Sequence, residues 1–174
     1  SGGVKAALDA RIPVLGMGRN LLDNWYFVGG GSQLGENQFP VNQRGRTSYS
    51  GNAVYSIDRW QTWSDAALTV AADCCTYSGG SNASLGQKIV IPEISGRKVT
   101  ASILKKDGTL VTASGTAPLW TASDYTGLNL PGFTLQLRNG SGNHYYIALI
   151  KTTDDLIAVK LELGEQQTLC HNEG

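Results

Sequence analysis

The stretch VTASI, residues 99–103, alternates apolar and small polar side chains with a period of two. Such alternation is typical of a β-strand that has one face in a core. Asp107-Gly108 follows, a dipeptide that favours a tight hairpin turn, and residues 110–113 can form the returning strand. The sequence therefore predicts an antiparallel hairpin over residues 99–113.

The same period recurs in FTLQLR (133–138) and in IAVKLEL (157–163). In the latter we expect Ile157, Val159, Leu161 and Leu163 to face the core, and Ala158, Lys160 and Glu162 to face outward. Further short strands are predicted over residues 25–28, 53–60, 66–76, 87–91 and 145–150. Nine or ten short strands without supporting helices predict an all-β, jelly-roll-like antiparallel β-sandwich, in which the first and last strands would be neighbours.

The length of 174 residues fits one domain with a sizeable core. Residues 4–11 have a short helix-like pattern and are followed by Pro13, so residues 1–19 are expected to be a linker, helical or extended, or the end of an oligomerisation segment. The sandwich domain is predicted over residues 20–164, and residues 165–174 are expected to be a C-terminal tail.

The charge of the chain excludes several classes of partner. Formal net charge is zero and only 16% of residues are charged, which argues against binding to nucleic acid or to an anionic membrane. No apolar run approaches the roughly 20 residues of a membrane-spanning helix, so no membrane insertion is expected. Cys74, Cys75 and Cys170 are expected to be free, mostly buried thiols, although either of the first two could pair with Cys170.

No nucleophile elbow, phosphate-binding loop or Cys/His metal spacing is present in the sequence. A glycosidase needs two facing carboxyls, and the chain has only five glutamates, so a polysaccharide-degrading enzyme is not expected. Asp58, which precedes Arg59, is interpreted as a structural ion pair or turn bond. No cofactor is expected. Asp154-Asp155 could bind Ca²⁺, but a polar turn before the last strand is the simpler interpretation.

Aromatic and amide side chains in a weakly charged chain suit carbohydrate, because aromatic rings stack on sugar C–H faces and amides bond to hydroxyls. Trp25 and Trp60 are expected in the core because both lie in strand-like blocks. Asn42-Gln43-Arg44 can also be interpreted as an internal clamp in which Arg44 holds backbone carbonyls. The candidate ligand-binding residues are Trp63, Trp120, Tyr125, Tyr49, Tyr55, Asn42, Gln43 and Arg44.

Three blocks carry a resemblance to a known group of proteins: NLLDNWYF (20–27), VNQRG (41–45) and IDRW (57–60). Together with AVKLELG (158–164), they resemble domains of phage tail-fibre and receptor-binding proteins and of their prophage copies. The opening also resembles the first strand of jelly-roll carbohydrate-binding modules. Residues 29–38 look like an insertion between the first two blocks, and the chain after Gly164 retains only part of the usual continuation.

The resemblance implies a non-catalytic receptor-recognition domain that binds a cell-surface glycan or polysaccharide, often as a homotrimer. It implies a place in the virion tail of a phage or prophage particle made in the bacterial cytoplasm. The alternative is a purely structural tail-fibre module, a spacer or trimerisation cap without ligand. No sugar-contacting residue is implied by the resemblance.

Overall fold

The computed structural model describes residues 19–30, 39–80, 83–90, 96–117, 127–140, 144–149 and 153–164. These residues form thirteen β-strands and no helix, and the strands pair antiparallel throughout. The predicted all-β class is therefore confirmed for the described part of the chain. The linker expected over residues 1–19 and the tail over 165–174 lie outside it, except for Arg19.

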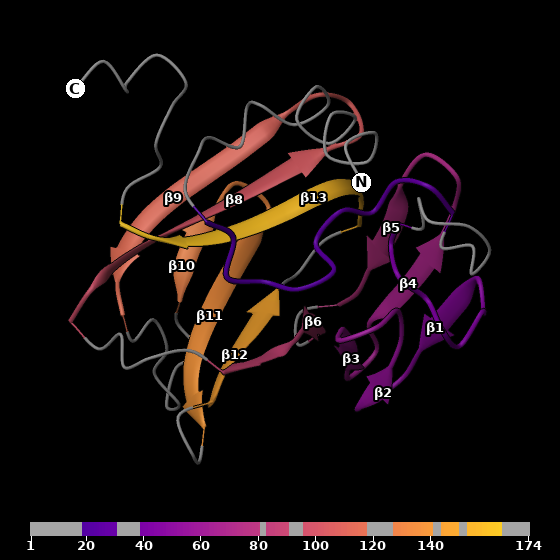
Figure 1. Cartoon of the computed structure of the whole chain (residues 1–174), viewed down its shortest axis with the longest axis horizontal. Coiled ribbons are helices and arrows are strands. Elements are labelled where there is room, and N and C mark those ends of the chain that lie inside the picture. Colours follow the sequence, from indigo (N-terminus) through magenta and orange to yellow (C-terminus); the bar gives the residue numbers. More distant parts are fainter. Residues whose placement is uncertain are drawn as a thin grey trace.

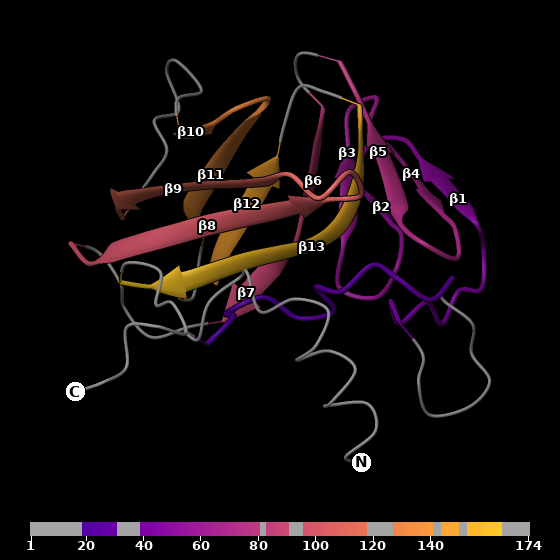
Figure 2. The ribbon, with the colours of Figure 1, turned by 90° about the horizontal axis from the view of Figure 1, so that it is seen from above.

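The strands form two sheets that lie in separate layers (Figures 1 and 2). Strands from the first half of the chain occupy one end of both sheets, and later strands occupy the other end (Figure 1). In spatial order, the first sheet contains β1 (Ser48–Ser50), β4 (Ala67–Val70), β5 (Cys75–Ser78), β13 (Asp154–Leu163), β8 (Lys98–Lys105) and β9 (Leu110–Thr116). The second contains β10 (Leu128–Leu130), β11 (Phe133–Gly140), β12 (His144–Leu149), β6 (Ser84–Gly86), β3 (Gln61–Trp63) and β2 (Val54–Tyr55), and β7 (Lys88–Val90) also pairs with β12.

The predicted hairpin is present as β8 and β9, which pair from Lys98–Thr116 to Leu104–Leu110. Its turn is closed by a hydrogen bond from Gly108 N to Lys105 O, and Gly108 has a φ of 91°, which glycine adopts without steric cost. The alternating residues Val99, Ala101 and Ile103 are all fully buried in the core, as predicted.

Two predicted strands are interrupted by turns. Residues 66–76 form β4 and the start of β5, because a turn closed by a bond from Ala71 N to Cys74 O separates them. Residues 53–60 contain only the two-residue β2 before a turn closed by Trp60 N to Ile57 O. Apolar content alone did not reveal these turns, because their closing bonds use backbone groups that any residue supplies.

The core lies between the two sheets. It combines aromatic side chains from the first part of the chain with aliphatic side chains from the later strands. Phe27 and Trp60 meet edge to face, with ring centroids 5.7 Å apart. The largest fully buried side chains are Trp60, Tyr49, Tyr77, Phe27, Ile57, Leu68, Leu85, Ile89, Ile103 and Leu135.

Residues 20–27 run beside the last strand, β13, although Tyr26 alone makes a bridge, to Ala158. The predicted strand over residues 25–28 is therefore reduced to this single bridge. Backbone bonds join Leu21 N to Leu161 O and Phe27 N to Ile157 O, at 2.7 and 2.9 Å. The beginning and the end of the domain are thus hydrogen-bonded to each other, which fixes the first block against the rigid centre of a sheet (Figure 1).

The outward face predicted for the last strand is not solvent-exposed. Lys160 is 3% exposed and Glu162 is 1% exposed, and their charged groups lie 3.3 Å apart. A register shift between Leu156 and Ala158 moves Ile157 out of the predicted inward set. Ile157 instead packs with Ala158 in a small second apolar cluster, so the prediction of a strict two-residue period along this strand was wrong at its start.

Candidate functional site

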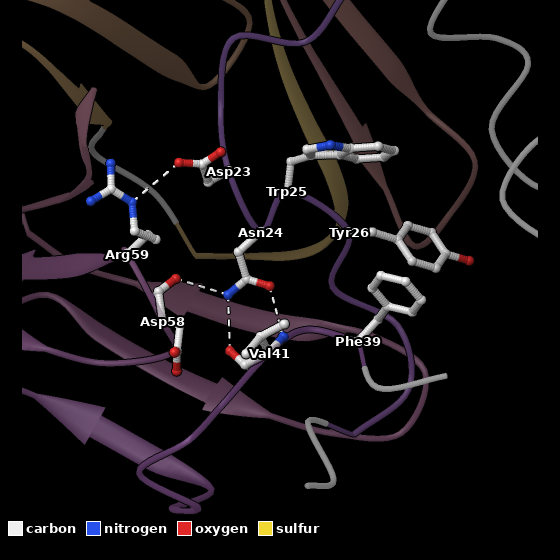
Figure 3. A pocket seen from close by; sticks show the side chains of 8 residues that line it. All are labelled: Asp23, Asn24, Trp25, Tyr26, Phe39, Val41, Asp58 and Arg59. Carbon is white, nitrogen blue, oxygen red and sulfur yellow. Dashed lines mark hydrogen bonds and ion pairs between the residues drawn. The ribbon is translucent and has the colours of Figure 1, made fainter. Parts of the chain in front are cut away.

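The three sequence blocks at residues 20–27, 41–45 and 57–60 meet at one place, and the side chain of Asn24 joins them (Figure 3). Its Nδ2 donates to Val41 O at 2.9 Å and to Asp58 O at 2.8 Å, while its Oδ1 accepts from Val41 N at 2.7 Å. Trp60 Nε1 donates to the backbone oxygen of Asn24 at 2.8 Å. Both N–H groups and the oxygen of this amide are bonded within the protein. Asn24 therefore positions the site, and contacts with a ligand would be made by neighbouring residues.

A pocket of about 420 Å³ opens at this junction (Figure 3). This volume is within the range of small-ligand sites. One part of its lining is aromatic and another is polar and charged. The lining residues are Asp23, Asn24, Trp25, Tyr26, Phe39, Val41, Asp58 and Arg59.

The aromatic part of the pocket is built from rings that fix one another. Tyr26 lies between Trp25 and Phe39, and it meets each of them edge to face, with centroid distances of 6.1 and 5.7 Å. Tyr26 is buried on Leu104 and Ala158, whereas Trp25 and Phe39 are half-buried. Such packing holds the Trp25 indole in a defined orientation, with part of its surface accessible to a ligand.

The charged part of the pocket consists of Asp23 and Arg59. Arg59 Nε lies 3.2 Å from Asp23 Oδ2, and an Nη2 hydrogen bond of 2.6 Å reaches Lys88 O. Both side chains remain accessible, 65% for Asp23 and 48% for Arg59. A ligand can therefore reach a carboxylate and a guanidinium that are already held side by side.

Backbone geometry at the pocket is unusual in two places. Asn24 has a φ of 51° and Arg59 has a φ of 74°, in the left-handed region that residues with a Cβ rarely adopt. Asparagine tolerates this region, but for arginine it costs roughly 1 kcal/mol or more. Ala53 and Ser64, which do not line the pocket, also have a positive φ, of 58° and 59°, so this backbone geometry does not by itself mark the site.

Asp23 is held in place through its backbone. Its N–H donates to Gln87 Oε1 at 2.8 Å, and its carbonyl oxygen accepts from Gln87 Nε2 at 2.9 Å. Gln87 itself is buried, just before β7. The Asp23 carboxylate can therefore exchange partners without loss of these two bonds.

The second carboxylate in the lining, Asp58, is already engaged. Its Oδ1 accepts a bond of 2.8 Å from Gln43 N, which confirms the predicted turn bond. The residue lies in a turn and not in the predicted strand.

Within the described ranges, no group of three or more His, Cys, Asp or Glu side chains is arranged to hold a metal ion. Asp154 pairs with Lys105 at 2.8 Å, and Asp155 accepts from Thr76 Oγ1 at 2.6 Å.

The predicted loop residues divide into buried and exposed members. Asn42 and Tyr49 are each 2% exposed and hydrogen-bond to each other, so their side chains hold the loop and do not reach a ligand. Arg44 Nη1 donates to Ser56 O at 3.1 Å, in agreement with the internal-clamp interpretation. Gln43 and Tyr55 are exposed, and the Arg44 guanidinium carbon lies 5.4 Å from the centre of the Tyr55 ring.

The tryptophans differ from the prediction in one case. Trp60 is fully buried, as expected, but Trp25 is only half-buried and lines the pocket. Trp63 is half-buried in β3. Trp120 and Tyr125 lie outside the described residues.

Sequence reasoning missed Asp23, Trp25 and Arg59 as members of a site. Two features of the sequence could have indicated them. All three belong to the blocks 20–27 and 57–60, and one block supplies a carboxylate where the other supplies an arginine. Trp25 was assigned to the core because its neighbours are strand-like. The segment instead makes one β-bridge to β13, so part of the ring remains accessible.

Neither a protein-family model, nor a curated protein, nor a solved structure matches this chain. The described residues contain no helix of sufficient length and apolarity to cross a membrane. The geometry of the pocket is therefore the observation from which function is inferred.

Proposed function

We propose that this chain is a non-catalytic carbohydrate-binding domain that recognises a cell-surface glycan, with its site in the pocket lined by Asp23, Trp25 and Arg59. The observation that carries the proposal is the combination, in one pocket, of an accessible Trp25 ring and the accessible Asp23–Arg59 pair. A sugar ring has an apolar C–H face and a rim of hydroxyl groups, and the two parts of this pocket match them.

In this proposal the Trp25 indole stacks on the C–H face of one sugar residue. The Asp23 carboxylate accepts bonds from hydroxyl groups, and the Arg59 guanidinium donates to ring or hydroxyl oxygens. Bonds to charged groups are stronger than neutral ones, which favours this pair as the source of orientation. Gln87 fixes the backbone of Asp23, and the Lys88 carbonyl oxygen holds the Arg59 guanidinium, so less conformational entropy is lost on binding.

The resemblance of the three blocks to phage tail-fibre and receptor-binding domains supports host-surface glycan as the ligand, a jelly-roll arrangement of the sandwich, and a homotrimeric assembly in the virion tail. A single open pocket of this size binds sugar weakly. Three copies presented together would raise the apparent affinity for a repeating polysaccharide without any additional contact.

A structural module, a spacer or trimerisation cap, is the second candidate. It is favoured by the number of polar side chains in the blocks that are used in internal bonds, namely Asn24, Asn42, Asp58 and the clamp made by Arg44. Under this alternative the same residues would fix the fold and the pocket would stay without a ligand.

The test is a glycan array of bacterial surface polysaccharides probed with the purified chain, with and without Ca²⁺. Any hit is then measured by calorimetry with Trp25→Ala and Asp23→Asn. Asp23→Asn keeps the backbone bonds to Gln87 and nearly the same shape, so it tests the carboxylate alone. Trp63→Ala is the matched control, because Trp63 is also half-buried but lies on β3 and does not line the pocket.

We expect reproducible binding to one sugar class, weakened at least tenfold by either pocket change and unaffected by Trp63→Ala. Thermal unfolding of each variant shows whether a loss of binding is a loss of folding. Binding that survives both pocket changes would reject the pocket but keep the function. A blank array from a folded protein of known oligomeric state would favour the structural module.

A further inference from the structure

A second feature lies on the loop that follows the pocket. Asn42 to Gly45 forms a turn closed by a bond from Gly45 N to Asn42 O at 3.0 Å, and Gly45 has a φ of 72°. The two central residues of this turn, Gln43 and Arg44, are exposed, as is Arg46 just after it. The turn therefore presents two guanidinium groups at the surface, at the end of the sandwich that contains β1 and β2 (Figure 1).

Both arginines are held in place, but neither is neutralised by a described carboxylate. Arg44 donates one N–H to Ser56 O and stacks over Tyr55, which leaves most of its five donors for a ligand. Arg46 lies over the ring of Tyr49 at 5.6 Å. The carboxylate bonded to this loop, Asp58, accepts from the Gln43 amide and makes no ion pair with either guanidinium.

Tyr55 adds an apolar surface to these charges. At 52% exposure it is the one large hydrophobic side chain that is exposed in the described part of the chain. The exposed Tyr55 ring lies beside the Arg44 guanidinium, and this arrangement suits a sugar that carries a negative charge. The aromatic ring can stack on the sugar, and the planar guanidinium can bind a carboxylate or phosphate through two parallel bonds.

We infer that the recognised glycan is acidic, with a carboxylate or phosphate on its sugars, and that Arg44, Arg46 and Tyr55 form the subsite for this acid group. The inference rests on the proposed carbohydrate-binding function and names its ligand class. Nucleic acid is a poorer match, because a chain of zero net charge with two such arginines lacks the extended basic surface that a phosphate backbone requires.

The test compares acidic polymers with their neutralised forms. Polygalacturonate and its carboxyl-reduced form probe recognition of the carboxylate. A phosphomannan before and after removal of phosphate probes recognition of the phosphate. Both pairs are measured together with the acidic and neutral glycans found on the array. The variants are Arg44→Gln, Arg44→Lys and Tyr55→Ala. Arg97→Gln is the matched control, because it removes the same charge from an exposed position just before β8.

We expect the acidic form of at least one pair to bind at least tenfold tighter than its neutral form, and added sodium chloride to weaken only the acidic form. Arg44→Gln should remove most of this preference, Arg44→Lys part of it, and Arg97→Gln none. Tyr55→Ala should weaken binding of the acidic form, because the ring that stacks on its sugar is lost. If the glycans found are neutral, or if acidic and neutral forms bind alike and Arg44→Gln changes nothing, the inference is wrong and the proposed function stands. A folded protein that binds no polymer counts against both.

Discussion

Asn24 and Val41 are joined by a pair of hydrogen bonds in which one side-chain amide takes both backbone groups of Val41. Asn24 Nδ2 donates to Val41 O at 2.9 Å, and Asn24 Oδ1 accepts from Val41 N at 2.7 Å. The side-chain amide of Asn24 thus makes the two hydrogen bonds that the backbone of a paired β-strand would make to Val41. Because Asn24 also bonds Asp58 O, one side chain holds together three segments that are distant in sequence.

We predict that Asn24→Ala lowers the free energy of unfolding by about 3 kcal/mol. The change removes three internal bonds, each worth roughly 1 kcal/mol net, and keeps a residue with a Cβ at a φ of 51°. Urea unfolding at neutral pH measures the effect. Asn24→Gly is the control: it loses the same bonds but relieves the backbone, so it should be less destabilised. Equal stability of Asn24→Ala and the parent chain would contradict the clamp.

The β-strands and their hairpin could be predicted from the sequence because both depend on local features. The two-residue period over 99–103 and the Asp107-Gly108 turn are local features, and the hairpin that they predict is present as β8 and β9, although Thr100 and Ser102 on the other face are buried too. The shift at Ile157 and the turns after Val70 and Ile57 were missed, since they depend on backbone bonds and pairing partners distant in sequence.

The pocket could be predicted only in part. The three blocks were singled out in the sequence by their resemblance to tail-fibre domains, and the bonds of Asn24 show that they meet in the structure. The roles within them could not be assigned from residue type. Asn42 in the loop and Tyr49 in β1 have the chemistry of ligand contacts, but their buried side chains bond to each other, whereas Trp25 has the chemistry of a core residue but lines the pocket.

We predict that Arg59→Gly weakens glycan binding at least tenfold while the free energy of unfolding changes by less than about 1 kcal/mol. Glycine adopts a φ of 74° without the roughly 1 kcal/mol that a Cβ costs, and this gain offsets the loss of surface bonds to Asp23 and Lys88. Calorimetric titration and chemical unfolding measure the two quantities. Arg59→Lys keeps the charge and the strain, so it should be the less stable of the two variants. A large loss of stability in Arg59→Gly would show that Arg59 serves the fold.

The buried pair Lys160–Glu162 gives a third prediction. Glu162→Leu should lower the free energy of unfolding by about 3–5 kcal/mol, because it removes the carboxylate that lies 3.3 Å from a buried ammonium group. The double change Lys160→Met with Glu162→Leu should cost less than Glu162→Leu alone, since two apolar side chains avoid the desolvation of charge. Chemical unfolding of the single and double variants tests this order. Lys106→Met, which removes the exposed pair with Asp73, is the control and should have little effect. A double variant less stable than Glu162→Leu would contradict the argument.

The last prediction concerns alkaline pH. Burial raises the pKa of the Cys75 thiol from 9.0 to about 12, with a smaller contribution from Cys74, and burial likewise raises the pKa of Tyr77. Above pH 9 the thiol ionises in the unfolded chain but stays protonated in the folded one, so the unfolded state binds fewer protons and stability falls as pH rises. In urea unfolding under reducing conditions, the contribution of the Cys75 thiol to the free energy of unfolding should therefore be constant below pH 9, and the free energy should decline between pH 9 and 12.

Cys75→Ala should lose part of this decline, because the variant no longer has a thiol that ionises only on unfolding. Ile103→Val is the matched control: it also truncates a fully buried side chain but removes no titratable group, so it should lower stability at every pH and keep the slope of the parent chain. An unchanged slope in Cys75→Ala would mean that the thiol ionises as easily in the folded chain as in the unfolded one, which contradicts its burial beneath Phe27, whose carbonyl oxygen lies 3.7 Å from the sulfur.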